Sequence, residues 1–158
     1  MEYIINSQKE GIDFERYAAY LDSIRNRLPA HVGAFASDSR HFDLSSHSSL
    51  HDAWLESLTV SEAATGQRSE IRRLEIHLCL LGPFHDRRIH LRYSGVTRYR
   101  FDLSAQEGEQ VAQGDLFTHE IRVNDAGALI HEILFQNATL LIECRDMRHS
   151  EEMIEAEQ

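Results

Sequence analysis

Residues 74–80 read Leu-Glu-Ile-His-Leu-Cys-Leu, and this stretch decides the fold class. Its even-numbered positions are all apolar, whereas Glu75, His77 and Cys79 alternate with them. Because successive side chains of a strand point to opposite faces, this period of two predicts a strand with one buried face. The strand ends at Gly82-Pro83, since this dipeptide is typical of a turn.

Strand-like segments continue on both sides of this stretch. Residues 88–103 alternate in the same way and predict one long strand with a bend or bulge at Gly95. Upstream, the irregular phase of residues 53–61 predicts a strand with a bulge. Three more strands are predicted at 116–123, 129–135 and 140–147. About six strands without helical crossovers predict a mostly antiparallel sheet, strongly curved or partly closed into a barrel.

A helix is predicted before the sheet, over residues 13–28. Its apolar residues recur every three or four positions and form one face, at Phe14, Tyr17, Leu21, Ile24 and Leu28. Pro29 is expected to end it, and residues 30–50 to form a Ser-rich loop with one short helical turn. The chain is thus predicted to be one α+β domain, with helix and loop at 1–50, sheet at 51–148 and an acidic tail at 149–158.

Composition excludes some classes of function. The 158 residues include 16 basic and 26 acidic side chains, a net charge of −10, which argues against binding nucleic acid or an anionic membrane. The charge suits a basic protein partner, or only keeps the protein soluble. We expect no membrane span, no secretory signal at the N-terminus, and reduced, buried Cys79 and Cys144. These features predict a cytoplasmic protein.

Two His-Asp steps could carry chemistry. His51-Asp52 precedes one predicted strand and His85-Asp86 follows another, so a meander brings both to one end of the sheet. Counting strands onward places further polar residues at this end: Asn124, Asp125, Asp146, Arg148 and His149. A histidine beside a carboxylate can act as a general base or a metal ligand, so His51, Asp52, His85 and Asp86 are the catalytic candidates. Alternatively, these residues cap strand ends and pin loops.

A metal site is not expected from the spacing of the histidines. His47 and His51 have the i, i+4 spacing of helical zinc ligands, with His41 as a distant third, but Ser48-Ser49-Leu50 does not favour a helix. The two cysteines lack Cys-x-x-Cys spacing. We therefore predict no metal and no cofactor.

Two other features have competing interpretations. Arg87, Arg92, Arg98 and Arg100 predict a local basic face that either receives an anionic group or is simply solvated. In the hairpin of residues 116–135, a four-residue turn pairs His119 with Glu132 and Glu120 with His131, whereas a three-residue loop with Gly127 in a bulge shifts the register by one. Cross-strand charge pairing accounts for these residues in either register.

The stretches Leu50-His51-Asp52-Ala53-Trp54-Leu55 and Gly82-Pro83-Phe84-His85-Asp86 carry a resemblance. Together with residues 127–135, they make residues 50–147 similar to small bacterial proteins of unknown function with an "HDA…GP(F/Y)HD" sheet motif. Distantly similar proteins include immunity proteins of bacterial toxin systems, which implies an acidic, non-enzymatic binder in the cytoplasm.

The expected function is therefore a protein-binding module that neutralises a basic partner. The alternative is an enzyme, or a metal- or ligand-binding protein, that uses the His/Asp cluster at one rim of the sheet. A third interpretation is a homodimer formed through an exposed edge strand.

Overall fold

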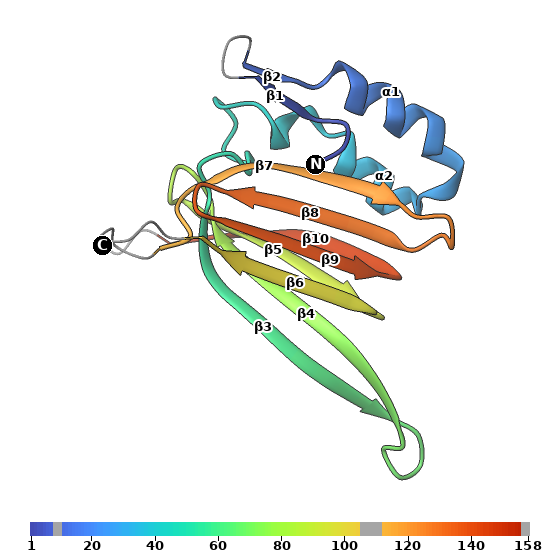
Figure 1. The fold of residues 1–158 in the computed structure, drawn as a ribbon. Coiled ribbons are helices and arrows are strands. Elements are labelled where there is room, and N and C mark those ends of the chain that lie inside the picture. The colour runs from blue at the N-terminus through green and yellow to red at the C-terminus, as the bar shows by residue number, and fades with distance from the viewer. Residues whose placement is uncertain (8–10, 105–111, 156–158) are drawn as a thin grey trace.

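The computed structural model describes residues 1–7, 11–104 and 112–155 (Figure 1). Two helices and two 3-10 turns come early in the chain: α1 (Glu15–Ile24), η1 (Arg25–Arg27), α2 (Ala30–Ala36) and η2 (Ser39–His41). The strands of the first half are β1 (Ile5–Ser7), β2 (Gly11–Asp13), β3 (Trp54–Thr65), β4 (Ile71–Leu81) and β5 (Arg87–Ser94). Those of the second half are β6 (Arg98–Leu103), β7 (Leu116–Val123), β8 (Leu129–Phe135), β9 (Ala138–Cys144) and β10 (Asp146–Met153).

The predicted α+β class with antiparallel strands is confirmed. The strands form two four-stranded sheets, in the orders β10-β5-β4-β3 and β6-β9-β8-β7, and a small β1-β2 hairpin. Figure 1 shows the two large sheets facing each other, with α1, α2 and the β1-β2 hairpin on the side of β7. The core lies between the sheets, where Leu78 and Leu91 of one and Ile133 and Leu140 of the other are fully buried.

No closed barrel forms among the described strands, because the chain leaves one sheet for the other at a corner. Gly95 has a φ of 60° and separates β5 from β6, so residues 88–103 are two strands in different sheets rather than one. Arg145 separates β9 from β10 at the same corner, where its N–H donates to the carbonyl of Ser94 at 3.1 Å. The apolar alternation runs through this corner, so it could not reveal the change of sheet.

Both ends of the predicted layout need correction. The helix predicted over 13–28 is α1 followed by η1, and Pro29 stands at the N-terminal end of α2 rather than closing one long helix. Residues 149–153 belong to β10, which pairs with β5, and are not a tail. The predicted bulge in the first strand of the meander is confirmed between Leu55 and Ser57. No described helix has the length and apolar character needed to cross a membrane.

The helical layer covers the free edge of β7. The hydroxyl of Tyr17 accepts the Ile121 N–H at 2.8 Å, and that of Tyr20 accepts the Val123 N–H at 2.9 Å. These bonds satisfy backbone groups that an edge strand otherwise leaves unpaired. They also hold the helical layer against β7, and α2 in this layer contacts β10.

Candidate metal centre

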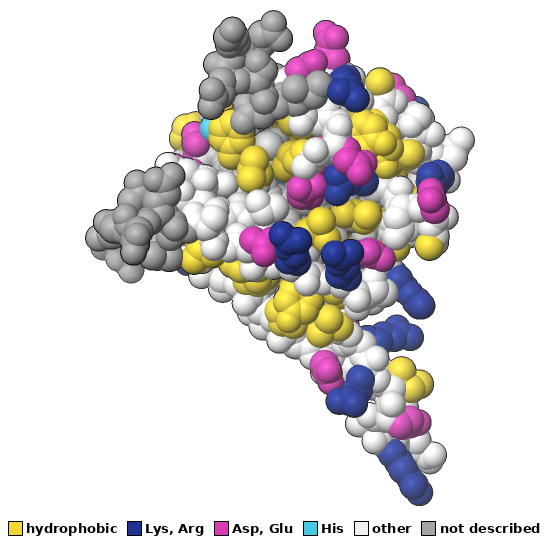
Figure 2. Space-filling view, viewed as in Figure 1, with side chains coloured by type: hydrophobic (Ala, Val, Ile, Leu, Met, Phe, Trp, Pro, Cys, Tyr) yellow, Lys and Arg dark blue, Asp and Glu magenta, His cyan; other side chains and the backbone are white. Residues whose placement is uncertain are grey.

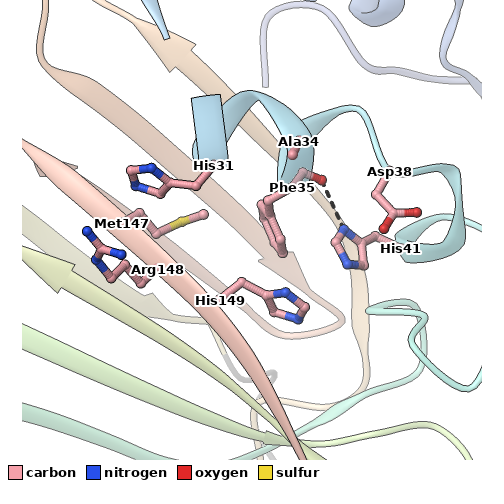
Figure 3. Close-up of a pocket in the computed structure, with 8 residues that line it drawn as sticks. All are labelled: His31, Ala34, Phe35, Asp38, His41, Met147, Arg148 and His149. Carbon is pink, nitrogen blue, oxygen red and sulfur yellow. Dashed lines mark hydrogen bonds between the residues drawn. The ribbon is translucent and has the colours of Figure 1, made fainter. Parts of the chain in front are cut away.

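Three potential metal ligands meet between η2 and β10. One nitrogen each of His41 and His149 and one oxygen of Glu151 lie within 4.8 Å of one another. His149 and Glu151 are two residues apart on β10, so the pleat of the strand places both on the same face. Figure 3 shows His41 on the η2 side and His149 on β10, with Phe35 of α2 beside both rings.

The short η2 turn presents the His41 ring in a defined tautomer. Asp38 caps this turn by accepting the Arg40 backbone N–H at 3.0 Å. The ring Nδ1 of His41 lies 3.0 Å from the carbonyl oxygen of Phe35, which can only accept, so Nδ1 carries the hydrogen. The lone pair is therefore on Nε2, which is buried and has no hydrogen-bond partner in the described part of the chain. This is the state in which histidine binds metals.

Glu151 is held by groups that leave one of its oxygens available. Its Oε2 accepts hydrogen bonds from Arg87 at 2.7 Å and from Ser48 at 3.1 Å. Its Oε1 lies 3.6 Å from Nε2 of His149, a nitrogen that is also buried and has no hydrogen bond to any described residue. Carboxylates that bind metals are commonly oriented by such outer hydrogen bonds.

The protonation states suit metal ligands at neutral pH. Burial lowers the pKa of His41, and burial together with the neighbouring His41 lowers that of His149 to about 4. Burial acts to raise the pKa of Glu151, but hydrogen bonds from Arg87 and Ser48 outweigh it and leave this pKa lowered. Both imidazoles are therefore neutral and the carboxylate is ionised, so no proton has to leave before a cation binds.

A buried chain of hydrogen bonds lies behind Phe35. The Tyr93 hydroxyl is 2.8 Å from Nδ1 of His131, and Nε2 of His131 is 3.1 Å from Nδ1 of His119. Phe35 packs against both of these rings as well as against His41 and His149. The outer nitrogen of His119, Nε2, is buried without a partner among the described residues. Four imidazoles thus surround one phenyl ring.

The register of the β7-β8 hairpin explains why His119 and His131 are buried. Glu120 faces Glu132 and Ile121 faces His131, so the register is the one shifted by a residue, with Gly127 at a φ of 83°. In this register His119 and His131 point into the core. Cross-strand charge pairing of these histidines with glutamates is therefore wrong.

The open side of the candidate centre is a pocket of about 310 Å³. His41 and His149 line it together with Ala34, Phe35 and Met147, and His31, Asp38 and Arg148 complete the wall (Figure 3). The one carboxylate of the wall, Asp38, is already paired with Arg40, and His31 binds Asp146 at 2.6 Å.

The predicted catalytic residues contact several different neighbours. Asp52 Oδ1 lies 3.0 Å from Nδ1 of its neighbour His51, Asp86 Oδ2 lies 2.7 Å from His47, and the His85 ring packs on Trp54. Asp52 and His85 have φ values of 64° and 58°, which marks tight turns. His51 and His85 do share one end of the sheet, near the start of β3 and of β5. The rim there resembles strand capping more than a site.

Of the other residues assigned to that rim, Asp146 and the Asn124-Asp125 turn lie at the opposite end, whereas Arg148 and His149 lie within β10. Asp146 pairs with Ser94 at the end of β5, whereas Met153 pairs with Arg87 at its start. Leu116 begins β7 beside Ala53, so the Asn124-Asp125 turn at the far end of β7 is also remote from His51. These placements were wrong because the chain reverses at Gly95. β5 and β6 therefore run in opposite directions, and every later strand is inverted relative to the prediction.

The four arginines do not form one basic stripe. Arg87 and Arg92 are on β5, where they bind Glu151 and Ser150, and Arg98 and Arg100 are on β6 in the other sheet. Arg100 pairs with Asp102 of its own strand. The predicted anion-binding face is thus divided between two sheets, and Arg87 serves the metal centre instead.

The His-Asp steps are expected to contribute modestly to stability. Asp86→Ala removes contacts with His47 and Arg87 at a partly exposed position, so we expect a cost of about 1 kcal/mol and a fall in Tm of roughly 2–4 °C. His51→Ala removes a half-buried ring and a contact with Asp52, with a similar expected cost. Thermal unfolding of both variants beside the wild type measures this. An unchanged or raised Tm in both variants would contradict a capping role and would make these residues candidates for a functional site again.

No protein-family model matches this chain, and a search of curated proteins found no relative at a significant level of similarity.

Proposed function

We propose that this protein binds a divalent transition metal through His41, His149 and Glu151. The observation that carries the proposal is the meeting of three donor atoms within 4.8 Å, two of them buried imidazole nitrogens without hydrogen bonds. A buried polar atom without a partner costs roughly 1–3 kcal/mol. A bound cation would satisfy both nitrogens at once, which gives a physical reason for the arrangement.

The donor set indicates the class of metal. Two histidines and one glutamate form the protein ligands of catalytic zinc sites and of non-haem iron(II) sites, both of which keep coordination positions open. Donors about 2.1 Å from a tetrahedral metal are roughly 3.4 Å apart, close to the 3.6 Å between His149 Nε2 and Glu151 Oε1. A metal here would act as a Lewis acid toward a water or ligand in the adjoining pocket.

Metal titration of the chelator-treated protein tests this proposal. Cobalt(II) reports tetrahedral nitrogen and oxygen ligands by its visible absorption, and zinc should then displace it with a stoichiometry of one. Zinc at about 100 times its Kd stabilises the folded state by roughly 2.7 kcal/mol, which raises Tm by roughly 5–10 °C. We expect His149→Gln and Glu151→Gln each to abolish the absorption band and most of the rise in Tm.

The matched control is His31→Gln, which alters a histidine of the same pocket that is already bound to Asp146. This variant should bind cobalt as the wild type does. A rise in Tm that survives in His149→Gln, or a wild type whose spectrum and Tm do not respond to any of these ions, would refute the proposed site.

Binding of a basic protein partner, as an immunity-like module, stays a separate prediction. Its support is the net charge of −10 and the resemblance in residues 50–147, and neither depends on the metal centre. Co-purification with a basic partner at low salt that is lost at high salt would support it.

A further inference from the structure

The hairpin of β3 and β4 extends beyond the rest of the molecule. We call residues 60–76 the arm, which Figure 1 shows as the projecting pair of strands at the bottom. From Val60 to Glu75, every described residue is exposed or half-buried, although the strands stay paired up to Thr65 and Ile71. A two-stranded ribbon is marginally stable in water by itself. The arm therefore lacks the packing that such a ribbon ordinarily needs.

One side of β3 is an unpaired strand edge. β3 is the last strand of its sheet, none of its 12 residues is buried, and within the described chain no backbone hydrogen bond reaches it from outside β4. The other sheet edges differ, because the tyrosines of α1 cover β7, α2 packs on β10, and β6 has only 6 residues. A long exposed edge is a template for pairing with another strand.

The charges of the arm identify a second copy of this chain as its partner. The whole chain carries a charge of −10, so two copies repel each other over most of their surfaces. The arm is neutral, because its three glutamates are balanced by three arginines, at Glu62, Glu70 and Glu75 and at Arg68, Arg72 and Arg73. Figure 2 shows basic, acidic and hydrophobic side chains mixed along it. A strongly basic partner would gain little attraction there.

We propose that β3 pairs antiparallel with β3 of a second copy across a two-fold axis, which joins the two four-stranded sheets into one. The inner face of the sheet must continue across the axis, so even-numbered residues of β3 must face even-numbered residues of its mate beyond the bulge. An axis at Val60 keeps the overlap long and places an apolar side chain of each copy at the centre of the interface.

Pairing about Val60 also covers apolar side chains on the inner face of the arm. Val60 is 39% exposed, and Leu58 and Leu74 beside it are half-buried. In the dimer, Val60 faces its own symmetry mate, and these leucines lie next to the joined strands. The interface is isologous, so it closes at two copies and does not form a filament.

Sedimentation of the full chain tests the proposal. The wild type should sediment with about twice the monomer mass of 18.2 kDa. Val60→Lys places two ammonium groups against each other at the axis, and a repulsion of this kind should weaken the dimer by roughly a hundredfold or more. Tyr99→Lys is the matched control, because it makes the same change at a 45% exposed position on the edge strand of the other sheet. It should remain dimeric.

A cross-linking variant gives a second readout that does not require loss of assembly. Val60→Cys places two thiols across the axis, and a short bismaleimide should link them into a covalent dimer, whereas Tyr99→Cys should form no covalent dimer under the same treatment. A monomeric wild type at high protein concentration overturns the proposal. So does a dimer that Val60→Lys leaves intact, or a Val60→Cys protein that does not cross-link.

Discussion

Replacing Glu120 by alanine is expected to lower the free energy of unfolding by roughly 3–5 kcal/mol, the usual cost of breaking a buried charged network. Glu120 is fully buried on β7. Its two carboxylate oxygens accept the backbone N–H groups of Glu2, Tyr3 and Ile4, at 3.0, 2.8 and 2.8 Å. Alanine leaves all three N–H groups without an acceptor, which releases the N-terminal segment from the sheet.

The charges around Glu120 add to the expected loss. Glu120 and Glu132 face each other directly across the strands, and Arg122 compensates this repulsion through contacts of 3.2 and 2.9 Å. The N-terminal amine of Met1 binds Glu132 at 2.8 Å. Removing Glu120 leaves Arg122, whose side chain is 11% exposed, with one close partner instead of two.

Urea and thermal unfolding of the wild type and three variants measure this effect. Glu120→Ala should lower Tm by roughly 10 °C, since 1 kcal/mol corresponds to about 2–4 °C at this chain length. Glu120→Gln keeps one acceptor oxygen and should fall between this variant and the wild type. Asp22→Ala removes an exposed carboxylate 4.0 Å from Arg25 and should change stability by less than about 1 kcal/mol. Equal stabilities for Glu120→Ala and Asp22→Ala would contradict the anchoring role.

The second large effect is a loss of stability in mild acid. Burial lowers the pKa of His131 to about 3 and that of His149 to about 4, and it also lowers the pKa values of His41 and His119. In the unfolded chain these imidazoles titrate near 6.5. Below pH 6.5 these histidines bind protons in the unfolded state but not in the folded state. The free energy of unfolding is therefore unaffected above about pH 6.5 and falls as the pH drops toward 4.

The expected size of this effect is large compared with the stability of a typical domain. An imidazole that stays neutral in the folded state contributes about 1.4 kcal/mol per pH unit in this window, so His131, whose pKa is about 3, costs roughly 3 kcal/mol by pH 4. Typical domains have a total stability of about 5–15 kcal/mol. The lowered pKa values of Asp38 and Asp86, both about 2, act only below about pH 4. The loss of stability between about pH 6.5 and 4 therefore reflects protonation of the histidines.

The pH dependence is measured by urea unfolding in the presence of a chelator. His131→Gln retains a donor and an acceptor for Tyr93 and His119 but cannot take up a proton. Its stability should fall less steeply between pH 6.5 and 4 than that of the wild type. If the free energy of unfolding falls equally steeply with pH in both proteins, protonation of His131 is not the cause of the acid instability.

Local patterning in the sequence predicted much of the sheet. The alternation of residues 74–80 corresponds to β4, the irregular phase before Ser57 is a bulge, and the lack of helical crossovers indicated antiparallel strands. These features depend on neighbours in the chain, where the period of two and the turn residues act directly. The same reasoning predicted a bend at Gly95 but not the change of sheet there or at Arg145, because a strand keeps its alternation when it enters another sheet.

The candidate site was decided by tertiary structure. His149 and Glu151 have the i, i+2 spacing of one strand face, a signal that was hidden when these residues were assigned to a tail. The sequence left the register of β7 and β8 open, and the register in the structure puts His119 and His131 on the same face, in the core. His41 joins β10 only because the helical layer anchors on β7 through Tyr17 and Tyr20. The sequence by itself determined strands and turns, whereas contacts between distant segments, set by core packing and strand register, determined which polar groups meet.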